Sequence, residues 1–216
     1  MIKAVIFDMD GVLFDTERLV GKVWNQIAAE EGIKEMDIVL NNCIGRSYED
    51  TRLVFREHYG EAFDFDGFRT KARQLFFENI KAHGLPIKTG VNELLAYLKE
   101  KGYQIGLASS TNKEGVLSHL REANIEAYFE VIVGGDMVKH SKPNPEIYEM
   151  ACRLLGVKPS EAICIEDSHN GIRSASSAGL KVIMVPDLLE PTEEILPLLH
   201  KQFSSLLEVK AYLEQM

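Results

Sequence analysis

The sequence predicts an α/β fold, in which a parallel sheet with helices on both faces carries an all-helical segment inserted after its first strand. A short apolar run, Ala4 to Phe7, stops at two carboxylates, which is typical of a buried strand that opens into a functional turn. About seventy residues with helical signals alone follow this run. Beyond residue 90 strand and helix patterns alternate, and this alternation indicates a parallel sheet.

The first strand ends at Asp8 and Asp10. Because these acids are two residues apart, their carboxylates leave an extended chain on the same side and converge. Like charges held together repel one another unless a cation lies between them, and a hard divalent cation with oxygen ligands meets that need. A polar turn, in which Asp makes local hydrogen bonds, explains this stretch alone equally well.

The inserted segment carries three helical patterns. They cover residues 18–31, 47–59 and 66–83, and a glycine follows each of them, at Gly32, Gly60 and Gly84. An ordinary crossover between parallel strands is much shorter than this segment. We therefore expect a helical cap domain over residues 15–84, and an α/β core domain formed by residues 1–14 and 85–216.

The rest of the chain alternates between helices and strands. We expect helices over 91–101, 113–123, 146–155 and 171–178, and strands over 104–108, 131–133, 162–165 and 182–185. Two more helical stretches are expected over 192–199 and 205–214. Ligands of open α/β sheets bind outside the carboxyl ends of the strands, so the residues that follow each strand are the candidates for a site.

Acids, hydroxyls and one lysine follow the strands of the expected sheet. They are Asp8 and Asp10 after the first strand, Ser109 and Ser110 after the second, Lys142 in the loop after the third, and Glu166 and Asp167 after the fourth. Carboxylate oxygens suit Mg²⁺, which also binds phosphate oxygens. Hydroxyls, backbone N–H groups that open a helix and an ammonium favour an anion. The two groups together describe a site for a phosphoryl group.

The same residues indicate a reaction. Asp8 is placed to attack phosphorus and form an aspartyl phosphate, and Asp10 to protonate the leaving alcohol and then activate water. Mg²⁺ and Lys142 would reduce the charge repulsion between the nucleophile and the phosphate. Singly each residue has a simpler explanation, because Lys142 can be a solvated loop lysine and Ser109 a helix cap. Their joint occurrence at strand ends favours an active site.

These residues resemble the motifs of the haloacid dehalogenase superfamily, and of its branch of β-phosphoglucomutase-like enzymes and small-molecule phosphatases. The matching stretches are Asp8-Met9-Asp10-Gly11-Val12, Ser109 after Leu107-Ala108, Lys142-Pro143, and Glu166-Asp167-Ser168. The resemblance covers essentially the whole chain. It implies a Rossmann-like core with the first strand in the middle, and a helical cap that opens and closes over the site.

The resemblance also implies roles for the candidate residues. Asp8 would be the nucleophile and Asp10 the acid and base, while Ser109 and Lys142 would hold the phosphate. We add Ser110, which follows Ser109, as a further candidate to bind it. Mg²⁺ would sit on Asp8, on the backbone carbonyl of Asp10 and on Asp167, with Glu166 close by or joined through a water. The expected function is Mg²⁺-dependent hydrolysis of a small phosphorylated metabolite, such as a sugar phosphate.

The cap is expected to select the substrate. Thr16, at the hinge, and Arg46, between two cap helices, are candidates to contact it, although Arg46 is equally well a surface arginine at a helix start. A β-phosphoglucomutase-type hexose phosphate mutase is the alternative function, but such mutases carry a histidine where this chain has Val20. A non-catalytic phosphate-binding regulatory protein is an alternative of another class; it would be expected to lose one of the key acids or the lysine, and all of them are present.

The composition excludes several other classes. The net charge of −9 argues against a nucleic-acid or anionic-membrane surface, since both need a basic patch. The three cysteines form no CxxC pair, so we expect reduced, buried thiols and no zinc site. We see no signal peptide and no apolar run long enough to span a membrane. These features lead us to expect a soluble, cytoplasmic protein. We expect it to be a monomer, although none of these features bears on its oligomeric state.

Overall fold

The computed structural model describes residues 1–44 and 48–216. The chain divides into two compact units, one formed by residues 1–15 and 86–216, the other by residues 16–85. The boundaries expected for the inserted segment, 15 and 84, each lie one residue from this division. Each unit has its own hydrophobic core.

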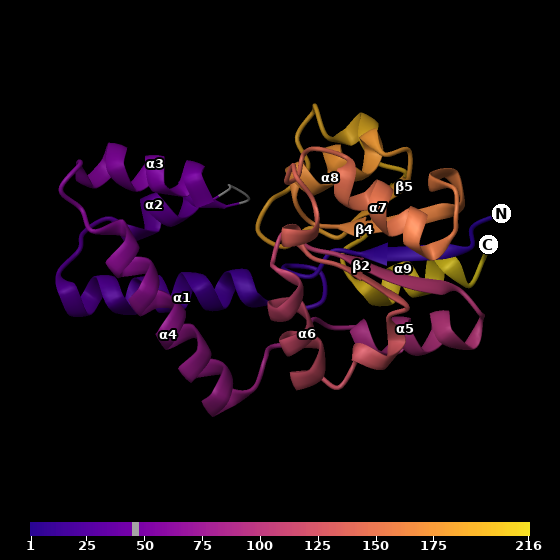
Figure 1. Cartoon of the computed structure of the whole chain (residues 1–216), viewed down its shortest axis with the longest axis horizontal. Helices are drawn as coiled ribbons and strands as arrows, with labels where there is room; N and C mark the ends of the chain where they lie inside the picture. Colours follow the sequence, from indigo (N-terminus) through magenta and orange to yellow (C-terminus); the bar gives the residue numbers. More distant parts are fainter. Residues whose placement is uncertain (45–47) are drawn as a thin grey trace. The chain divides into compact units, whose positions relative to one another are not determined.

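The larger unit contains a six-stranded parallel sheet (Figure 1). Its strands are β1 (Ala4–Phe7), β2 (Gln104–Ala108), β3 (Val131–Val133), β4 (Ala162–Glu166), β5 (Lys181–Met184) and β6 (Lys201–Gln202), in the order β3-β2-β1-β4-β5-β6. As predicted, β1 lies in the middle of the sheet. Phe7 is level with Leu107 of β2 and with Ile165 of β4, so these three strands end side by side. This register brings the residues that follow them to one point at the sheet edge.

Helices cover both faces of the sheet (Figure 1). They are α5 (Val91–Glu100), α6 (Lys113–Glu122), α7 (Glu146–Leu155), α8 (His169–Ser177) and α9 (Leu206–Leu213), with α7 and α8 on one face and α5, α6 and α9 on the other. Because successive side chains of a strand point to opposite faces, Ala4 and Ile6 pack in the cluster under α7 and α8, while Val5 and Phe7 point the other way. The predicted α/β class is confirmed.

The smaller unit is entirely helical in its described part. Its helices are α1 (Thr16–Glu31), α2 (Met36–Cys43), α3 (Tyr48–Tyr59) and α4 (Phe65–His83). Aromatic rings form its core: the Trp24 ring lies 5.2 Å from that of Phe55 and 5.5 Å from that of Phe68, measured between centroids. Edge contacts of this kind stabilise a small helical core beyond the area that they bury. The expected start of the second helix at Ser47 lies outside the described residues.

The structure corrects two predictions at the level of elements. Helix α2 lies between the first two helices that the sequence predicts; it is short, and it starts after Glu35, a residue in the left-handed region whose side chain makes no cap hydrogen bond. The helix predicted over 192–199 is wrong, since only a 3₁₀ turn at Leu196–Leu198 forms, followed by the unpredicted strand β6. Pro191 and Pro197 explain this, because proline lacks the N–H that a helix interior requires. Among the described residues, none of the helices has the length and apolar character needed to cross a bilayer.

Candidate active site

The site begins where the ladder of the sheet ends. The backbone N–H of Asp8 still donates to the carbonyl of Ile165, at 2.9 Å, and that of Ser109 to the carbonyl of Val133, at 3.0 Å. The strands therefore fix the backbone of the first residue beyond β1 and β2. Asp8 and Ser109 are both buried, as are Glu166 and Asp167 at the end of β4.

Lys142 joins the ends of three strands. Its Nζ donates to Asp8 Oδ1 at 2.5 Å, to Glu166 Oε1 at 2.7 Å and to the carbonyl of Ala108 at 3.1 Å. An ammonium has three hydrogens, so these acceptors match its full donor capacity. The side chain is only 6% exposed, which makes the two ion pairs far less screened than surface pairs.

Glu166 is held by five donors. Its Oε2 accepts from the backbone N–H of Asp167 and from the N–H and hydroxyl of Ser168, each at 3.0 Å. Its Oε1 accepts from Lys142 and from the Tyr148 hydroxyl, the latter at 2.8 Å. Burial by itself raises the pKa of Glu166, but the Lys142 ammonium and these donors outweigh it and hold the pKa below its ordinary value.

The two carboxylates that share Lys142 differ in their ionisation. Burial raises the pKa of Asp8 to about 8, although the Lys142 ammonium acts in the opposite direction, and the negative charges of Glu166 and Asp10 add to the rise. Burial also lowers the pKa of the Lys142 ammonium, but Asp8 and Glu166 raise it above the ordinary lysine value. Without a further cation, the site thus carries more negative charge than Lys142 compensates.

Three of the acids are placed to share a cation. One carboxylate oxygen from each of Asp8, Glu166 and Asp167 lies within 4.8 Å of the others. Gly11 makes room for this group, since a Cβ at that position would lie 2.1 Å from Asp167 Oδ2, and its φ of +81° also favours glycine. Hard oxygen donors and a surplus of negative charge fit Mg²⁺.

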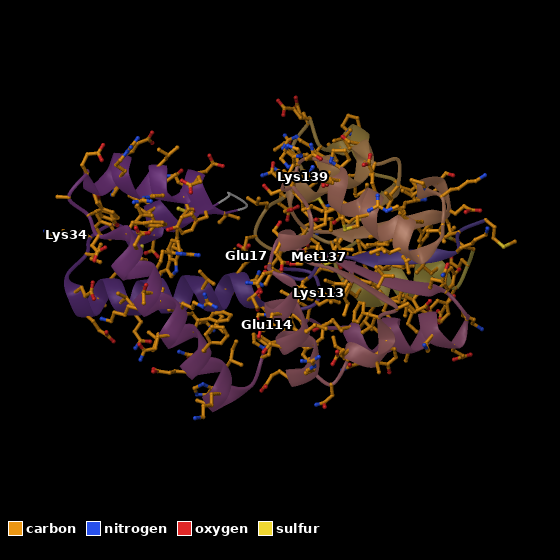
Figure 2. The ribbon with its side chains drawn as sticks, in the orientation of Figure 1. Glu17, Lys34, Lys113, Glu114, Met137 and Lys139 are labelled. Atoms are coloured by element: carbon orange, nitrogen blue, oxygen red, sulfur yellow. The ribbon has the colours of Figure 1, made fainter. Side chains whose placement is uncertain are left out.

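Asp10 and Ser109 are joined by a residue that the sequence did not single out. The Thr111 hydroxyl donates to Asp10 Oδ2 at 3.0 Å, and the Thr111 backbone N–H donates to Ser109 Oγ at 3.0 Å. The loop after β3 packs against this turn, because the Lys113 N–H donates to Asp136 Oδ1 at 2.8 Å. Figure 2 labels Lys113 and Met137 on these two segments.

Comparison with known proteins decides the family. The sequence profile of the haloacid dehalogenase-like hydrolases matches residues 5–185. The chain belongs to this family. A phosphatase of phosphorylated carbohydrates from Thermotoga maritima is 33% identical over 186 residues, which are 84% of each chain. These findings confirm the predicted family and the enzyme class, a phosphatase of the haloacid dehalogenase family.

Solved structures of the family share the fold over the whole length. β-Phosphoglucomutase from Clostridium difficile is 25% identical, with a TM-score of 0.78 over 100% of this chain and 96% of that one. CbbY from Rhodobacter sphaeroides, solved in complex with phosphate, is 28% identical, with a TM-score of 0.76 over 97% and 96% of the two chains. The inserted helical cap is part of this shared fold.

The core of this haloacid dehalogenase-like hydrolase brings most of the predicted residues together. Asp8 contacts Lys142, Lys142 contacts Glu166, and Asp167 completes the acidic group. Ser110 is exposed at the same sheet edge. Thr16 is buried at the first position of α1, in the cap unit, and Arg46 lies outside the described residues. Val20 is half-buried and packs against the cap core.

The sequence assigned no role in the site to three residues that shape it: Thr111, Tyr148 and Gly171. Tyr148 falls in the apolar stripe of α7, so its pattern indicates a core residue and not a partner of Glu166. Gly171 was predicted only as a helix start, yet a Cβ there would lie 1.6 Å from Glu166 Oε1. Helix α8 begins two residues earlier than predicted, at His169, because Ser168 Oγ accepts from the Gly171 N–H and caps it.

Proposed function

We propose that this phosphatase hydrolyses the phosphomonoester of a small phosphorylated metabolite through an aspartyl phosphate on Asp8. One observation carries the proposal: the buried Asp8 carboxylate, at the end of the central strand, meets the Lys142 ammonium at 2.5 Å and lies within 4.8 Å of two further acids. This is the arrangement expected of a carboxylate nucleophile whose charge must be balanced before it meets an anionic substrate.

Asp8, the backbone carbonyl of Asp10 and Asp167 would hold Mg²⁺ at this position. When bound, Mg²⁺ supplies positive charge that draws phosphate oxygens toward the nucleophile and lowers their mutual repulsion. Both oxygens of Glu166 already accept hydrogen bonds from the chain. We therefore assign Glu166 to the support of Lys142, with any role at the metal passing through water.

The reaction follows from these positions in two displacements. Asp8 attacks phosphorus, and the bond from phosphorus to the alcohol oxygen breaks as Asp10 gives that oxygen its proton. Asp10 then removes a proton from a water, which attacks the phosphorus and releases phosphate from Asp8. Thr111 holds the Asp10 carboxyl through its hydroxyl, at 3.0 Å, which orients the group for both proton transfers.

The phosphate is held by Lys142 together with Ser109 and Ser110. Ser109 Oγ accepts the Thr111 N–H, so its own hydroxyl hydrogen is the part left to donate to an anion. Gly134 and Gly135 let the loop after β3 approach this turn closely, since a Cβ at Gly135 would lie 2.2 Å from the Ser110 carbonyl. The loop is thereby fixed at the position where the phosphate would bind.

A sugar phosphate is the substrate class that we propose. A Thermotoga maritima relative is named for phosphorylated carbohydrates, and a β-phosphoglucomutase shares the fold. Thr16 and Arg46 are the proposed cap contacts. Mutase chemistry is the second candidate, favoured by the likeness to β-phosphoglucomutase, but Val20 packs in the cap core and has no group that exchanges protons. Hydrolysis is the better supported of the two.

The test is phosphate release from a panel of hexose, pentose, polyol and nucleoside monophosphates, with and without Mg²⁺. Asp8→Asn removes the nucleophile, and Asp37→Asn, on an exposed acid that accepts from Asn25, is the matched control. We expect Mg²⁺-dependent release that Asp8→Asn abolishes and Asp37→Asn leaves unchanged. Conversion of β-glucose 1-phosphate to glucose 6-phosphate without net release would show a mutase, and activity retained by Asp8→Asn would refute the covalent mechanism.

A further inference from the structure

We propose that Tyr148 is a positioning residue of this site: its hydroxyl fixes the Glu166 carboxylate, and its ring and that carboxylate together hold the Lys142 ammonium on Asp8. The catalytic consequence rests on the proposed phosphatase reaction. The geometric part, that Tyr148 sets the position of Lys142, does not depend on it.

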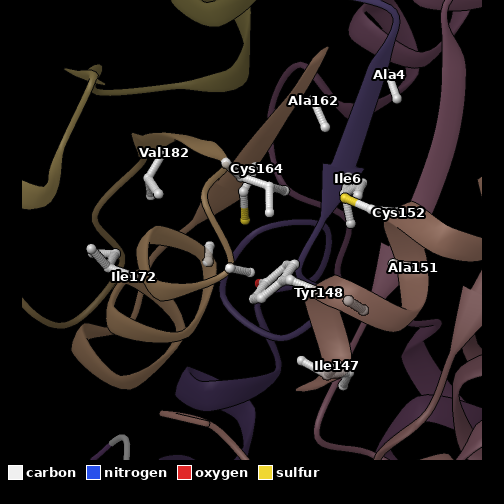
Figure 3. Close-up of a cluster of buried hydrophobic side chains, with 14 of the residues drawn as sticks. Ala4, Ile6, Ile147, Tyr148, Ala151, Cys152, Ala162, Cys164, Ile172 and Val182 are labelled. Atoms are coloured by element: carbon white, nitrogen blue, oxygen red, sulfur yellow. The ribbon is translucent and has the colours of Figure 1, made fainter. Parts of the chain in front are cut away.

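Tyr148 lies where its hydroxyl is not needed for packing. It sits on α7, fully buried in the cluster that also contains Ile147, Ala151 and Cys164 (Figure 3). A phenylalanine ring would fill nearly the same space in these apolar surroundings. A buried hydroxyl must be paired to be tolerated, and this one is paired with Glu166 Oε1, at 2.8 Å. The hydroxyl thus pairs with the acid, and Cys164, in the same cluster, is its second hydrogen-bond partner.

The ring of the same residue faces the other partner. Lys142 Nζ lies 4.9 Å from the centre of the Tyr148 ring, within the range of a cation–π interaction. Lys142 and Glu166 also contact each other at 2.7 Å. Ammonium, carboxylate and tyrosine thus form a closed group in which each member contacts the other two.

The closed group matters because a lysine is flexible and a carboxylate can rotate. Glu166 is anchored at Oε2 by the turn that follows β4, and at Oε1 by Tyr148 and Lys142. Without the Tyr148 hydroxyl, Lys142 would be the remaining donor to Glu166 Oε1. Lys142 reaches Asp8 at 2.5 Å from the same Nζ, so a shift of Glu166 changes the charge balance at the proposed nucleophile.

The variant to test is Tyr148→Phe, which keeps the ring and removes the hydroxyl. Tyr212→Phe is the matched control, because the Tyr212 hydroxyl also makes a 2.8 Å side-chain contact, with His200 Nε2, in the same unit and away from the site. We expect Tyr148→Phe to lower kcat roughly tenfold and to raise KM as well, because Lys142 both balances the transition-state charge and holds the phosphate. Tyr212→Phe should match the wild type in both constants.

A double variant separates positioning from a general loss of structure. If Tyr148 acts through Glu166, then adding Tyr148→Phe to Glu166→Gln should lower kcat by much less than it does in the wild type. The proposal would be overturned if Tyr148→Phe lowered kcat by the same factor with and without Glu166→Gln. It would also be overturned if the Tyr148→Phe enzyme had the kcat of the wild type. The unfolding temperature is recorded for every variant.

An activity-independent measurement covers the case in which Tyr148→Phe is poorly folded or the wild type acts on none of the tested substrates. The ¹⁵N signal of the Lys142 ammonium, assigned with Lys142→Met, reports on how this group is held. In the wild type we expect a slowly exchanging ammonium that Tyr148→Phe, but not Tyr212→Phe, shifts or broadens. A fast-exchanging wild-type signal, or one that is the same in all three proteins, would overturn the positioning role. Inactivity of the wild type with the expected signals would count against the proposed function alone.

Discussion

Single residues in this protein set the geometry of the acids. Gly171 is the clearest example, because the Glu166 carboxylate occupies the space that any side chain at residue 171 would need. Helix formation alone would favour alanine at that position by about 1 kcal/mol. Gly171 therefore makes room for Glu166 although it lowers the stability of α8. Its replacement by alanine tests which of these two effects matters more.

We expect Gly171→Ala to lower activity at least tenfold, because a Cβ placed 1.6 Å from Glu166 Oε1 must displace that carboxylate and with it Lys142. Gly21→Ala is the matched control, since a Cβ at Gly21, within α1, meets no atom within 4 Å. It should raise the free energy of unfolding by roughly 0.5–1 kcal/mol and leave activity unchanged. Phosphate release and urea unfolding measure both variants, and an active Gly171→Ala enzyme would contradict the assigned role of Glu166.

The three cysteines differ in burial, and burial sets the reactivity that we expect of each. Cys152 is buried, and burial raises the pKa of its thiol to about 11; burial raises that of Cys164 still more clearly, while Cys43 is half-buried. The thiolate is the reactive form, so a thiol reagent at pH 8 should modify Cys43 first in the native protein. Mass spectrometry should find one labelled site in native buffer and three in denaturant. Rapid labelling of Cys152 or Cys164 in the native state would contradict this burial.

At the scale of elements, a buried ion pair fastens two segments that are far apart in the chain. Lys88 lies shortly after the end of the helical unit, in the segment that leads to α5. Its Nζ lies 2.6 Å from Oδ1 of Asp187, in the loop after β5. The Asp187 side chain is fully buried and that of Lys88 is 19% exposed. The Lys88 N–H also donates to the carbonyl of Leu13, so the pair steadies the loop that carries Asp10.

Lys88→Met should lower the free energy of unfolding by about 3 kcal/mol, because it removes the cation from a buried carboxylate. Lys101→Met is the matched control, since the Lys101 ammonium pairs with Glu100 at 3.7 Å on the surface and should contribute almost nothing. Urea unfolding measures both. Equal, small effects of the two substitutions would show that the Lys88 pair is no stronger than a surface pair.

The helices and strands also show which parts of the fold can be predicted from the sequence. β1, β2, β3 and α7 have the bounds that periodicity predicts, because buried parallel strands and glycine-terminated helices carry strong local signals. The two residues of β6 carry no such signal, since pairing with β5 alone makes them a strand. In the site, Asp8, Lys142 and Glu166 were predicted because they lie at or after the ends of strands. The contacts of Thr111 and Tyr148 depend on tertiary packing, which no local pattern encodes.

At the scale of the whole molecule, the acids Asp8 and Glu166 make the free energy of unfolding depend on pH, and a bound metal should change that dependence. The pKa of Asp8 is about 8 in the folded protein and near 4 in an unfolded chain, so between these values the folded state binds the extra proton. Stability contributed by this group is present below about pH 4 and is lost as the pH rises toward 8. Glu166 has a lowered pKa and acts in the opposite sense, but only at acidic pH.

Mg²⁺ should reverse this loss, because a ligand carboxylate must be ionised and binding to the folded state alone raises the unfolding temperature. We expect the increase in unfolding temperature produced by a fixed Mg²⁺ concentration to be small at pH 6 and to grow up to about pH 8, as Asp8 gives up its proton.

Asp8→Asn removes both the titrating group and a ligand, so its metal-free stability should fall less with pH, and Mg²⁺ should stabilise it little. Thermal unfolding at pH 5, 6, 7 and 8, with and without Mg²⁺, measures all of this, with Asp37→Asn as the matched control. A Mg²⁺ effect that is the same at every pH, or that Asp8→Asn retains in full, would place the cation away from Asp8.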